Sequence, residues 1–415
     1  MQSRIADPSL YLQGEKSYKW AYSNMPTLVK IIEKLSHKRP LENRCIATCL
    51  HVTKETSVLI MGLKKLGADV YSAAANPLST QDDIAAYLVS QGVNVFAWRG
   101  ESIDEYFDCI RTILRAKPDI VMDDGSDAHV MIHEEGEFAN LNLIGGTEET
   151  TTGVIRLRAL EKAQRLRYPV IAVNNAYTKF LFDNRYGTGQ STFDGILRAT
   201  SLLIAGKKVV VCGYGWVGKG IAMRARGLGA IVIVCEVDPL KALEARMDGF
   251  EVKPLMEAAE EGDIFITATG QTRVIRMEHI ERMKDGAILA NAGHFDVEID
   301  VANLRKFAEN KGEVRKYVEE YRLKDGKKVY LIGQGRIANL VAAEGHPPEV
   351  MSLSFSNQLM SVVYLIDNEG KLERKVHNVP MEIDREVAQT TLEVMGIRID
   401  RLTDEQIEYA QSWAV

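Results

Sequence analysis

The chain has 415 residues, 46% hydrophobic and 26% charged, which is enough for two globular domains of ordinary composition. Its net charge of −6 gives no basic surface of the kind that binds nucleic acid. No apolar run is long enough for a membrane span, Met1 opens no signal peptide, and the five cysteines lack CxxC spacing. We therefore expect a cytoplasmic protein with reduced thiols that binds no metal, nucleic acid or membrane.

The first half of the chain alternates short apolar runs with helical patterns. One helix is predicted over residues 15–38 and ends before Pro40. The alternation that follows is typical of a doubly wound parallel sheet. We expect strands at 44–50, 69–74, 93–98, 119–122 and 170–173, a short strand near 144–145, and helices at 55–66, 80–91, 102–116 and 152–165.

Polar side chains follow several of these strands, at the sheet edge where such folds bind ligands. They lie at 51–55, 76–83, 123–127, 148–152 and 174–175. Any one of these groups could be a helix cap or a solvated loop. Packing alone does not explain why several strands deliver acids, a histidine and threonines to one edge, so the pattern predicts a ligand site.

A lysine and an aspartate stand four residues apart in the stretch 174–192. On a helix, this spacing places the amine of Lys179 and the carboxylate of Asp183 on one face, with Asn184 next to them. A surface ion pair of this kind would contribute little to stability. The other interpretation is a lysine held near a carboxylate so that it can move a proton from a substrate hydroxyl.

The second half begins with a dinucleotide-binding pattern. An apolar run at 209–212 leads into the glycine fingerprint GYGWVG, a helical pattern at 221–228 and a second strand at 231–235. Gly213 permits a tight turn, Gly215 lets the backbone approach a pyrophosphate, and Gly218 allows close helix–strand packing. Glu236 lies 23 residues after Gly213, where a carboxylate accepts ribose hydroxyls and repels a 2′-phosphate. The pattern predicts NAD rather than NADP.

Three further apolar runs, at 263–268, 287–292 and 329–332, extend a second sheet. His294 and His346 stand beside glycines in loops after these strands, where they would face a nicotinamide unless the loops are simply solvated. A helix at 351–366 is expected to cross back to the first domain, followed by helices at 385–395 and within 404–415. The predicted fold class is α/β, with two doubly wound Rossmann-like domains and a short C-terminal helical segment.

Long motifs along residues 20–400 resemble those of the adenosylhomocysteinases, the S-adenosyl-L-homocysteine hydrolases. The motifs are CLHVTKET (49–56), NPLSTQDD (76–83), DDGSD (123–127), EETTTG (148–153), YTKFLFDNRYG (177–187), GYGWVGKG (213–220), NAGHFDVEID (291–300) and EGHP (344–347). The resemblance implies two domains that close on the substrate around a tightly held NAD. It assigns 1–185 and 348–384 to the substrate-binding domain, 186–347 to the NAD-binding domain and 385–415 to a C-terminal segment.

The resemblance also implies a reaction, the reversible hydrolysis of S-adenosyl-L-homocysteine to adenosine and L-homocysteine. Oxidation of the 3′-hydroxyl to a ketone acidifies the C4′ proton, and loss of that proton expels homocysteine thiolate. Water then adds to the enone, and the ketone is reduced again. The cofactor carries the difficult chemistry, while the protein supplies position and proton transfers.

Motif positions assign roles around the ribose. Lys179 and Asp183 would serve the 3′-hydroxyl, while Glu149 would bind the ribose hydroxyls. His294 would hold the 3′-oxygen. The proton transfers at C4′ and C5′ would fall to His51 and Asp124, and the assignment among His51, Asp124 and Asp127 stays open.

The resemblance places the base, the gate and the cofactor as well. Thr53 and Glu55 would face the base, and His346 would line the gate through which substrate enters. The residues implied for NAD are Thr150, Thr151, Thr152, Asn184, Gly213, Gly215, Trp216, Val217, Gly218, Lys219, Gly220, Glu236, Ala292, Gly293, His294, Asn339 and His346.

Three positions depart from the pattern of many members. Thr188 replaces a cysteine, so a thiol there cannot be required, and Trp216 replaces an acid within the glycine fingerprint. The chain stops at Val415 without the tail bearing Lys and Tyr that reaches the neighbouring subunit's NAD in many relatives. This resembles the short archaeal and thermophilic-bacterial forms. A homotetramer is expected by resemblance only.

Three alternatives differ in substrate or class. Hydrolysis of S-inosyl-L-homocysteine stays open, because Glu55 can accept from N6–H of adenine or N1–H of hypoxanthine and the Thr53 hydroxyl can donate or accept. A catalytically inactive regulatory homologue would have lost residues such as Lys179 or Asp124, which are present. A simple 2-hydroxy-acid dehydrogenase would not account for the EETTTG motif.

Overall fold

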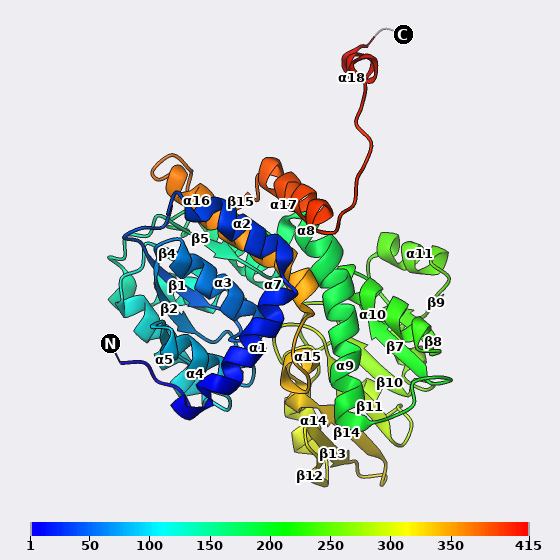
Figure 1. The fold of residues 1–415 in the computed structure, drawn as a ribbon. Coiled ribbons are helices and arrows are strands. Elements are labelled where there is room, and N and C mark those ends of the chain that lie inside the picture. The colour runs from blue at the N-terminus through cyan, green and yellow to red at the C-terminus, as the bar shows by residue number, and fades with distance from the viewer. Residues whose placement is uncertain (1, 414–415) are drawn as a thin grey trace.

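Two sheets, each with helices on both faces, make up the computed structural model, which describes residues 2–413 (Figure 1). The first sheet has the strand order β15-β6-β5-β4-β1-β2-β3, and the second has the order β12-β13-β14-β11-β10-β7-β8-β9. The chain order reverses between β4 and β1 and again between β10 and β7, and ligands bind at such switch points. The predicted α/β class with two Rossmann-like sheets is confirmed.

The first sheet is parallel throughout, as expected for strands buried between two layers of helices. Its strands are β1 (Cys45–Cys49), β2 (Asp69–Ala73), β3 (Asn94–Phe96), β4 (Ile120–Asp123), β5 (Gly145–Glu148), β6 (Val170–Ala172) and β15 (Val376–Asn378). Its helices are α1 (Tyr11–Ser23), α2 (Pro26–Ser36), α3 (Lys54–Lys65), α4 (Asp82–Ser90), α5 (Ile103–Arg115), α6 (Asp127–Glu134) and α7 (Thr151–Lys162), with 3-10 turns η1 (Pro8–Leu10), η2 (Gly136–Phe138) and η3 (Val173–Asn175).

The chain passes to the second sheet through α8 (Tyr177–Lys179), the π-helix η4 (Phe180–Gly187) and α9 (Thr188–Thr200). The second sheet contains β7 (Lys208–Cys212), β8 (Ile231–Cys235), β9 (Glu251–Val252), β10 (Ile264–Thr267), β11 (Ala287–Asn291), β12 (Asn310–Arg315), β13 (Val318–Arg322) and β14 (Lys328–Ile332). Its helices are α10 (Trp216–Gly227), α11 (Pro239–Met247), α12 (Leu255–Ala258), α13 (Met277–Ile280), α14 (Val301–Phe307), η5 (Gly333–Gly335) and α15 (Ala338–Val341).

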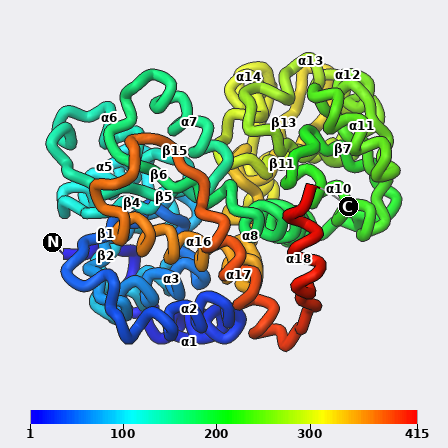
Figure 2. Tube along the Cα trace, turned by 90° about the horizontal axis from the view of Figure 1, so that it is seen from above, coloured from blue at the N-terminus to red at the C-terminus, as the bar shows by residue number. Residues whose placement is uncertain are grey.

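Helix α16 (Pro348–Asp367) brings the chain back to the first sheet, as predicted. Its residues Leu353, Phe355 and Leu359 are buried in one core with Leu28 of α2 and Leu59 of α3. Beyond α17 (Met381–Val394), an extended stretch leads to α18 (Asp404–Gln411), which stands apart from both sheets (Figure 1, Figure 2). Residues 414 and 415 of the predicted last helix lie outside the described residues.

The local structure differs from the sequence-based expectations at three places. The single helix predicted over 15–38 is wrong: Pro26 has no N–H to continue a helix, and it begins α2 after a break. The short strand near 144–145 extends to Glu148, through a Gly-Gly-Thr-Glu run without an apolar pattern. The hairpin β12–β13 was not predicted, because every residue of β12 is exposed and no alternation marks it. Within the described residues, no helix is long and apolar enough to cross a membrane.

Two glycines of α10 give a matched test of how closely this helix packs against the π-helix η4. A Cβ on Gly220 would lie 1.8 Å from the carbonyl oxygen of Arg185 in the π-helix, whereas a Cβ on Gly227 would meet nothing within 4 Å. We expect Gly220→Ala to lower the free energy of unfolding by about 1–3 kcal/mol, because the backbones must separate. Gly227→Ala should be neutral or stabilising by up to about 1 kcal/mol. Urea unfolding measures both, and equal effects would contradict the packing argument.

Candidate active site

A cavity of about 1190 Å³ lies between the carboxyl ends of the strands of both sheets. This is more than the roughly 300–1,000 Å³ of a typical small-ligand pocket. The predicted site residues that line it are His51, Thr53, Glu55, Asp124, Glu149, Thr150, Thr151, Thr152, Lys179, Asp183, Asn184, Gly213, Gly215, Trp216, Val217, Lys219, Glu236, Ala292, Gly293, His294 and His346. The structure therefore brings the switch points of both sheets to one cavity, with room for a dinucleotide beside a second ligand.

Three residues predicted to contact the cofactor do not line the cavity. Gly218 packs against the carbonyl oxygen of Gly213, which a Cβ would approach to 2.0 Å, and Gly220 packs against the π-helix. Asn339 is fully buried, and its side-chain amide donates to Ser191 Oγ at 3.0 Å. These three residues lie behind the cavity wall, where they fix the backbone that surrounds the site.

Lys179 lies at the centre of the cluster where the two sheets meet. Its Nζ is 2.9 Å from Asp183 Oδ2, 2.7 Å from Asn184 Oδ1 and 3.7 Å from Glu149 Oε1. The side chains of Lys179 and Asp183 are only 5% and 3% exposed, so the surface ion pair considered from the sequence is excluded.

The backbone that carries this cluster has an unusual start. Asp384 of α17 accepts hydrogen bonds from the amides of Tyr177 and Thr178, at 2.6 and 2.8 Å, and thereby caps the start of α8. Helix α8 then runs directly into the π-helix, a conformation that is rare and concentrated at functional sites. The capping residue comes from more than two hundred positions away, so local sequence could not reveal it.

The opposite charges of the Lys179 cluster stabilise one another's ionised forms. Burial disfavours the Lys179 ammonium, but the carboxylates of Asp183 and Glu149 outweigh that effect and raise the lysine's pKa. Burial also opposes the Asp183 carboxylate, yet His346 and Lys179 together hold its pKa well below the usual range. Lys179 and Asp183 are therefore an ion pair at neutral pH.

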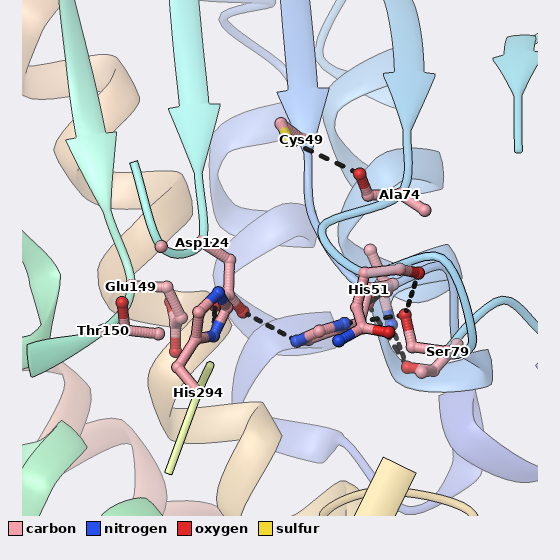
Figure 3. Close-up of polar contacts among 12 residues, drawn as sticks. Cys49, His51, Ala74, Ser79, Asp124, Glu149, Thr150 and His294 are labelled. Carbon is pink, nitrogen blue, oxygen red and sulfur yellow. Dashed lines mark hydrogen bonds and ion pairs between the residues drawn. The ribbon is translucent and has the colours of Figure 1, made fainter. Parts of the chain in front are cut away.

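A second cluster joins His51 and Asp124 of the first sheet to His294 of the second (Figure 3). Asp124 Oδ2 is 3.6 Å from His51 Nε2, and Asp124 Oδ1 is 3.4 Å from His294 Nδ1. Asp124 Oδ1 is buried and has no hydrogen-bond partner among residues 2–413, so it is free to bind a ligand. The three ligand atoms lie within 4.8 Å of one another, a grouping that could also hold a metal ion.

Burial sets the protonation of this second cluster. It lowers the pKa of His294 to about 4, and burial with the two neighbouring histidines holds the pKa of His51 well below its usual value. Burial and the carboxylates of Glu148 and Glu149 raise the pKa of Asp124 well above its usual value. Neutral imidazoles beside a carboxyl group can both give and take protons. Gly125 must stay a glycine, because a Cβ would lie 2.2 Å from His294 Nε2.

Glu149 is held by two residues that sequence reasoning missed. Ser354 and Gln358 of α16 both donate hydrogen bonds to its carboxylate, the second at 2.7 Å. The signal in the sequence was the run SLSFSNQ (352–358), which is rich in polar residues although the rest of the helix is largely apolar. Every residue of this run is buried. Ser79 was also missed as an individual residue, and its hydroxyl lies 2.8 Å from His51 Nδ1.

At the other end of the cavity, loops of the first sheet contact the segment that precedes α16. Lys54 Nζ lies 3.1 Å from Glu55 and 3.1 Å from Glu344. Gln81 donates to the carbonyl oxygen of Glu344 at 3.3 Å, and Arg99 donates to that of Val341 at 2.6 Å. These contacts tie the two halves of the molecule together beside Glu55. The Thr53 hydroxyl also caps α3.

His346 stands between this cavity and a second one of about 590 Å³, and lines both. Its Nδ1 is 2.5 Å from Asp183 Oδ1, and its Nε2 is 3.3 Å from Thr188 Oγ1. His346 therefore connects the wall between the two cavities to the Lys179 cluster through Asp183.

The glycine turn after β7 has the geometry that a pyrophosphate needs. Gly213 has a φ of +99°, and a Cβ on Gly215 would meet no atom within 4 Å, so the backbone is open to a ligand. Glu236 accepts hydrogen bonds from the amides of Tyr214 and Val237 at 2.6 and 2.7 Å, which fixes its carboxylate beside the turn. Cys212 and Cys235 end β7 and β8 directly opposite one another and line the cavity.

Burial of the neutral His294 should appear as a pH dependence of stability. Its folded pKa of about 4 lies below the ordinary value of 6.5, so the unfolded chain binds the proton first as pH falls, and stability falls below pH 6.5. Between pH 7 and 5, we expect wild type to lose about 2 kcal/mol more than His294→Gln. Urea unfolding at the two pH values tests this, and parallel pH curves would contradict it.

Comparison with known proteins gives one family. Residues 2–144 match the model of S-adenosyl-L-homocysteine hydrolase, and residues 184–345 match that of its NAD binding domain. The chain is 60% identical to the adenosylhomocysteinase of Sulfurisphaera tokodaii, over 100% of this chain and 99% of the relative. It is 58% identical to those of Saccharolobus solfataricus, over 100% and 99%, and Aeropyrum pernix, over 99% of each.

A solved structure of dipicolinate synthase from Bacillus halodurans matches with a TM-score of 0.49 at 14% identity, over 79% of this chain and 99% of that one. Family membership rests on the sequence identity and coverage of the relatives and on the match to both family models. The chain belongs to the S-adenosyl-L-homocysteine hydrolase family and contains that family's NAD-binding domain.

Proposed function

We propose that the protein hydrolyses S-adenosyl-L-homocysteine reversibly to adenosine and L-homocysteine, using NAD as a catalytic cofactor. The observation that carries the proposal is the buried Lys179–Asp183 pair next to the His51–Asp124–His294 cluster in one cavity. The relatives that share at least 53% of its sequence over nearly the full chain are named adenosylhomocysteinases.

The residues around the glycine turn fit the cofactor. The open backbone at Gly213 and Gly215 suits a pyrophosphate, and the carboxylate of Glu236 suits an adenosine ribose without a 2′-phosphate. Thr150 to Thr152, Asn184 and Ala292 to His294 line the remainder of the path to Lys179. When bound, NAD supplies reversible hydride transfer at the substrate's 3′-carbon.

Lys179 and its neighbours would act on the substrate ribose. Its ammonium passes a proton to Asp183, 2.9 Å away, and the resulting amine takes the proton of the 3′-hydroxyl, while Asn184 orients the amine from 2.7 Å. Glu149 accepts from the ribose hydroxyls, because Ser354 and Gln358 hold its carboxylate toward the cavity. Each of these groups is buried, so water competes little for the same hydrogen bonds.

The second cluster would move the protons at C4′ and C5′. Asp124 has an unpartnered oxygen to receive the C4′ proton, and His51, fixed by Ser79, serves the oxygen that adds at C5′. His294, which approaches Asp124 from the second sheet, holds the 3′-oxygen. The closeness of His51 to Asp124 lets the proton pass between them as the thiolate leaves and water adds.

The base would lie against Thr53 and Glu55. Burial raises the pKa of Glu55, while the adjacent Lys54 favours its ionised form, which accepts hydrogen bonds only. The N6 amino group of adenine offers a donor to this carboxylate. Hypoxanthine offers N1–H instead, so S-inosyl-L-homocysteine is the competing substrate in the turnover test.

We also propose the domain boundaries and assembly expected by resemblance: 1–185 with 348–384, 186–347, and 385–415, assembled as a homotetramer in the cytoplasm. Exposed apolar side chains on the C-terminal arm, among them Ile399, Leu402 and Tyr409, support association with another copy of the chain. All five cysteines are free thiols, which supports a reducing compartment.

Side-by-side turnover of the two thioethers tests the proposal. Purified NAD-loaded enzyme is given S-adenosyl- or S-inosyl-L-homocysteine, and released homocysteine is read with a thiol reagent. We expect a strong preference for the adenosyl compound. A preference for the inosyl compound would change only the roles of Thr53 and Glu55, whereas release from neither would contradict the hydrolase proposal.

Lys179→Met tests the proton transfer at the 3′-oxygen. We expect kcat to fall by about 10²–10⁴, because general acid–base catalysis is lost. Absorbance of NADH at 340 nm after adenosine is added should disappear in parallel, since it reports the oxidation step alone. Lys371→Met, an exposed lysine on the surface, is the control. Normal NADH formation by Lys179→Met would show that the lysine has another task.

A further inference from the structure

Two carboxyl groups lie directly behind the cavity wall and are not used in the chemistry above. Asp123 ends β4 and Glu148 ends β5, and the two residues are paired across these parallel strands. Both are 0% exposed, and neither lines the cavity. Their oxygens, with a ring nitrogen of His129, lie within 4.8 Å of one another. Each directly precedes a residue of the site, Asp124 or Glu149.

Glu148 ties together the two loops that carry those residues. Its Oε1 accepts from the amide of Gly125 at 2.9 Å and from the amide and hydroxyl of Thr150 at 2.8 and 2.7 Å. Its Oε2 accepts from the Ser126 hydroxyl at 2.7 Å. The fold leaves space for this side chain, because a Cβ on Gly153 would lie 2.1 Å from its carboxyl carbon.

The loop after β4 needs such support. Gly125 and Ser126 both have positive φ, +100° and +65°, and the second is costly for a residue with a side chain. Asp123 adds a further restraint, since it accepts from the amides of Asp124 and His129 at 2.9 Å each. The backbone on both sides of Asp124 is thus fixed by the buried pair.

We infer that Glu148 is a positioning residue of the proposed reaction: with Asp123 it sets the separation of Asp124 and Glu149, and the pair does so with one of its two carboxyl groups protonated. The inference rests on the proposed function for its catalytic readout. Because two buried carboxylates whose oxygens lie within 4.8 Å of one another cannot both ionise cheaply, one of them keeps its proton. Burial raises the pKa of Asp123 to about 7 and that of Glu148 to about 8.

The groups around the pair supply no cation that could replace this proton. His129 of α6 faces Asp123, but burial lowers its pKa to about 4, so it is neutral. Asp127 of α6, Asp124 and the Cys49 thiol of β1 add negative charge or none. Arg156 of α7 contacts Asp127 Oδ1 at 2.7 Å and the carbonyl oxygen of Gly125, not the pair. From the β6 side, Tyr168 bonds to His129.

The inference predicts how activity depends on alkaline pH. Loss of the remaining proton places two charges side by side and pushes the two loops apart, so kcat should fall above about pH 8 with an apparent pKa that belongs to the pair. Misplacement of a reacting group by about 1 Å can cost on the order of a hundredfold in rate. Glu148→Gln keeps an oxygen for Gly125 and Thr150 and carries no charge, so it mimics the protonated state.

The experiment is the pH profile of homocysteine release from S-adenosyl-L-homocysteine by NAD-loaded enzyme. We expect Glu148→Gln to retain kcat within about tenfold at pH 7 and to move the alkaline limb up by at least one pH unit. Glu148→Ala, which loses the contacts to both loops, should lose about a hundredfold in kcat with a smaller change in KM. Glu260→Gln, an exposed ion-pair residue of the second sheet, is the matched control and should behave as wild type.

A second readout does not require turnover. The folded pKa values lie above those of unfolded acids, so the folded chain binds the extra proton between about pH 4 and 8, and stability falls as pH rises through that window. The unfolding constant of wild type should rise at least tenfold more than that of Glu148→Gln over this window. An unmoved alkaline limb, or parallel stability curves, would overturn the inference, whereas absence of turnover in wild type would overturn the proposed function alone.

Discussion

The buried ammonium of Lys179 is the constraint on which the rest of the site depends. A lysine that is 5% exposed keeps its charge only if carboxylates and amides surround it, and here they come from separate parts of the chain. Asp183 lies one turn along, Glu149 ends the neighbouring loop, and α16 and α17 return more than 150 residues later to hold Glu149 and the start of α8. The buried charge therefore depends on the return of α16 and α17 to the first sheet.

The two sheets contribute different things to the cavity. The first delivers acids, histidine and threonines from the ends of β1, β4 and β5, and the second delivers an open glycine turn with a carboxylate beside it. They meet where His294 approaches Asp124, so the cluster exists only when both halves are in place. The contacts of Lys54, Gln81 and Arg99 to residues 341–344 hold the halves together at the far end of the same cavity.

Much of this could be predicted from sequence, because buried parallel strands are continuous apolar runs and the groups that bind ligands follow them. The failures have physical causes: Pro26 breaks a helix whose apolar spacing continues across it, and the exposed strand β12 has no pattern to detect. Within the site, residue types and their edge of the sheet were predictable. The partnership of Glu149 with Ser354 and Gln358, and that of Glu148 with Gly125, depend on tertiary contacts that no spacing encodes.

The burial of the cysteines matters for a protein whose proposed product is itself a thiol. Homocysteine would leave through a cavity lined by Cys212 and Cys235, and its disulfide form could exchange there with a protein thiolate. A hydrogen bond to Cys235 and burial raise the pKa of the Cys212 thiol well above its ordinary value, and Thr188 beside the gate has no sulfur to offer. Because exchange with disulfides requires a thiolate, the protonated Cys212 thiol does not capture the oxidised form of homocysteine.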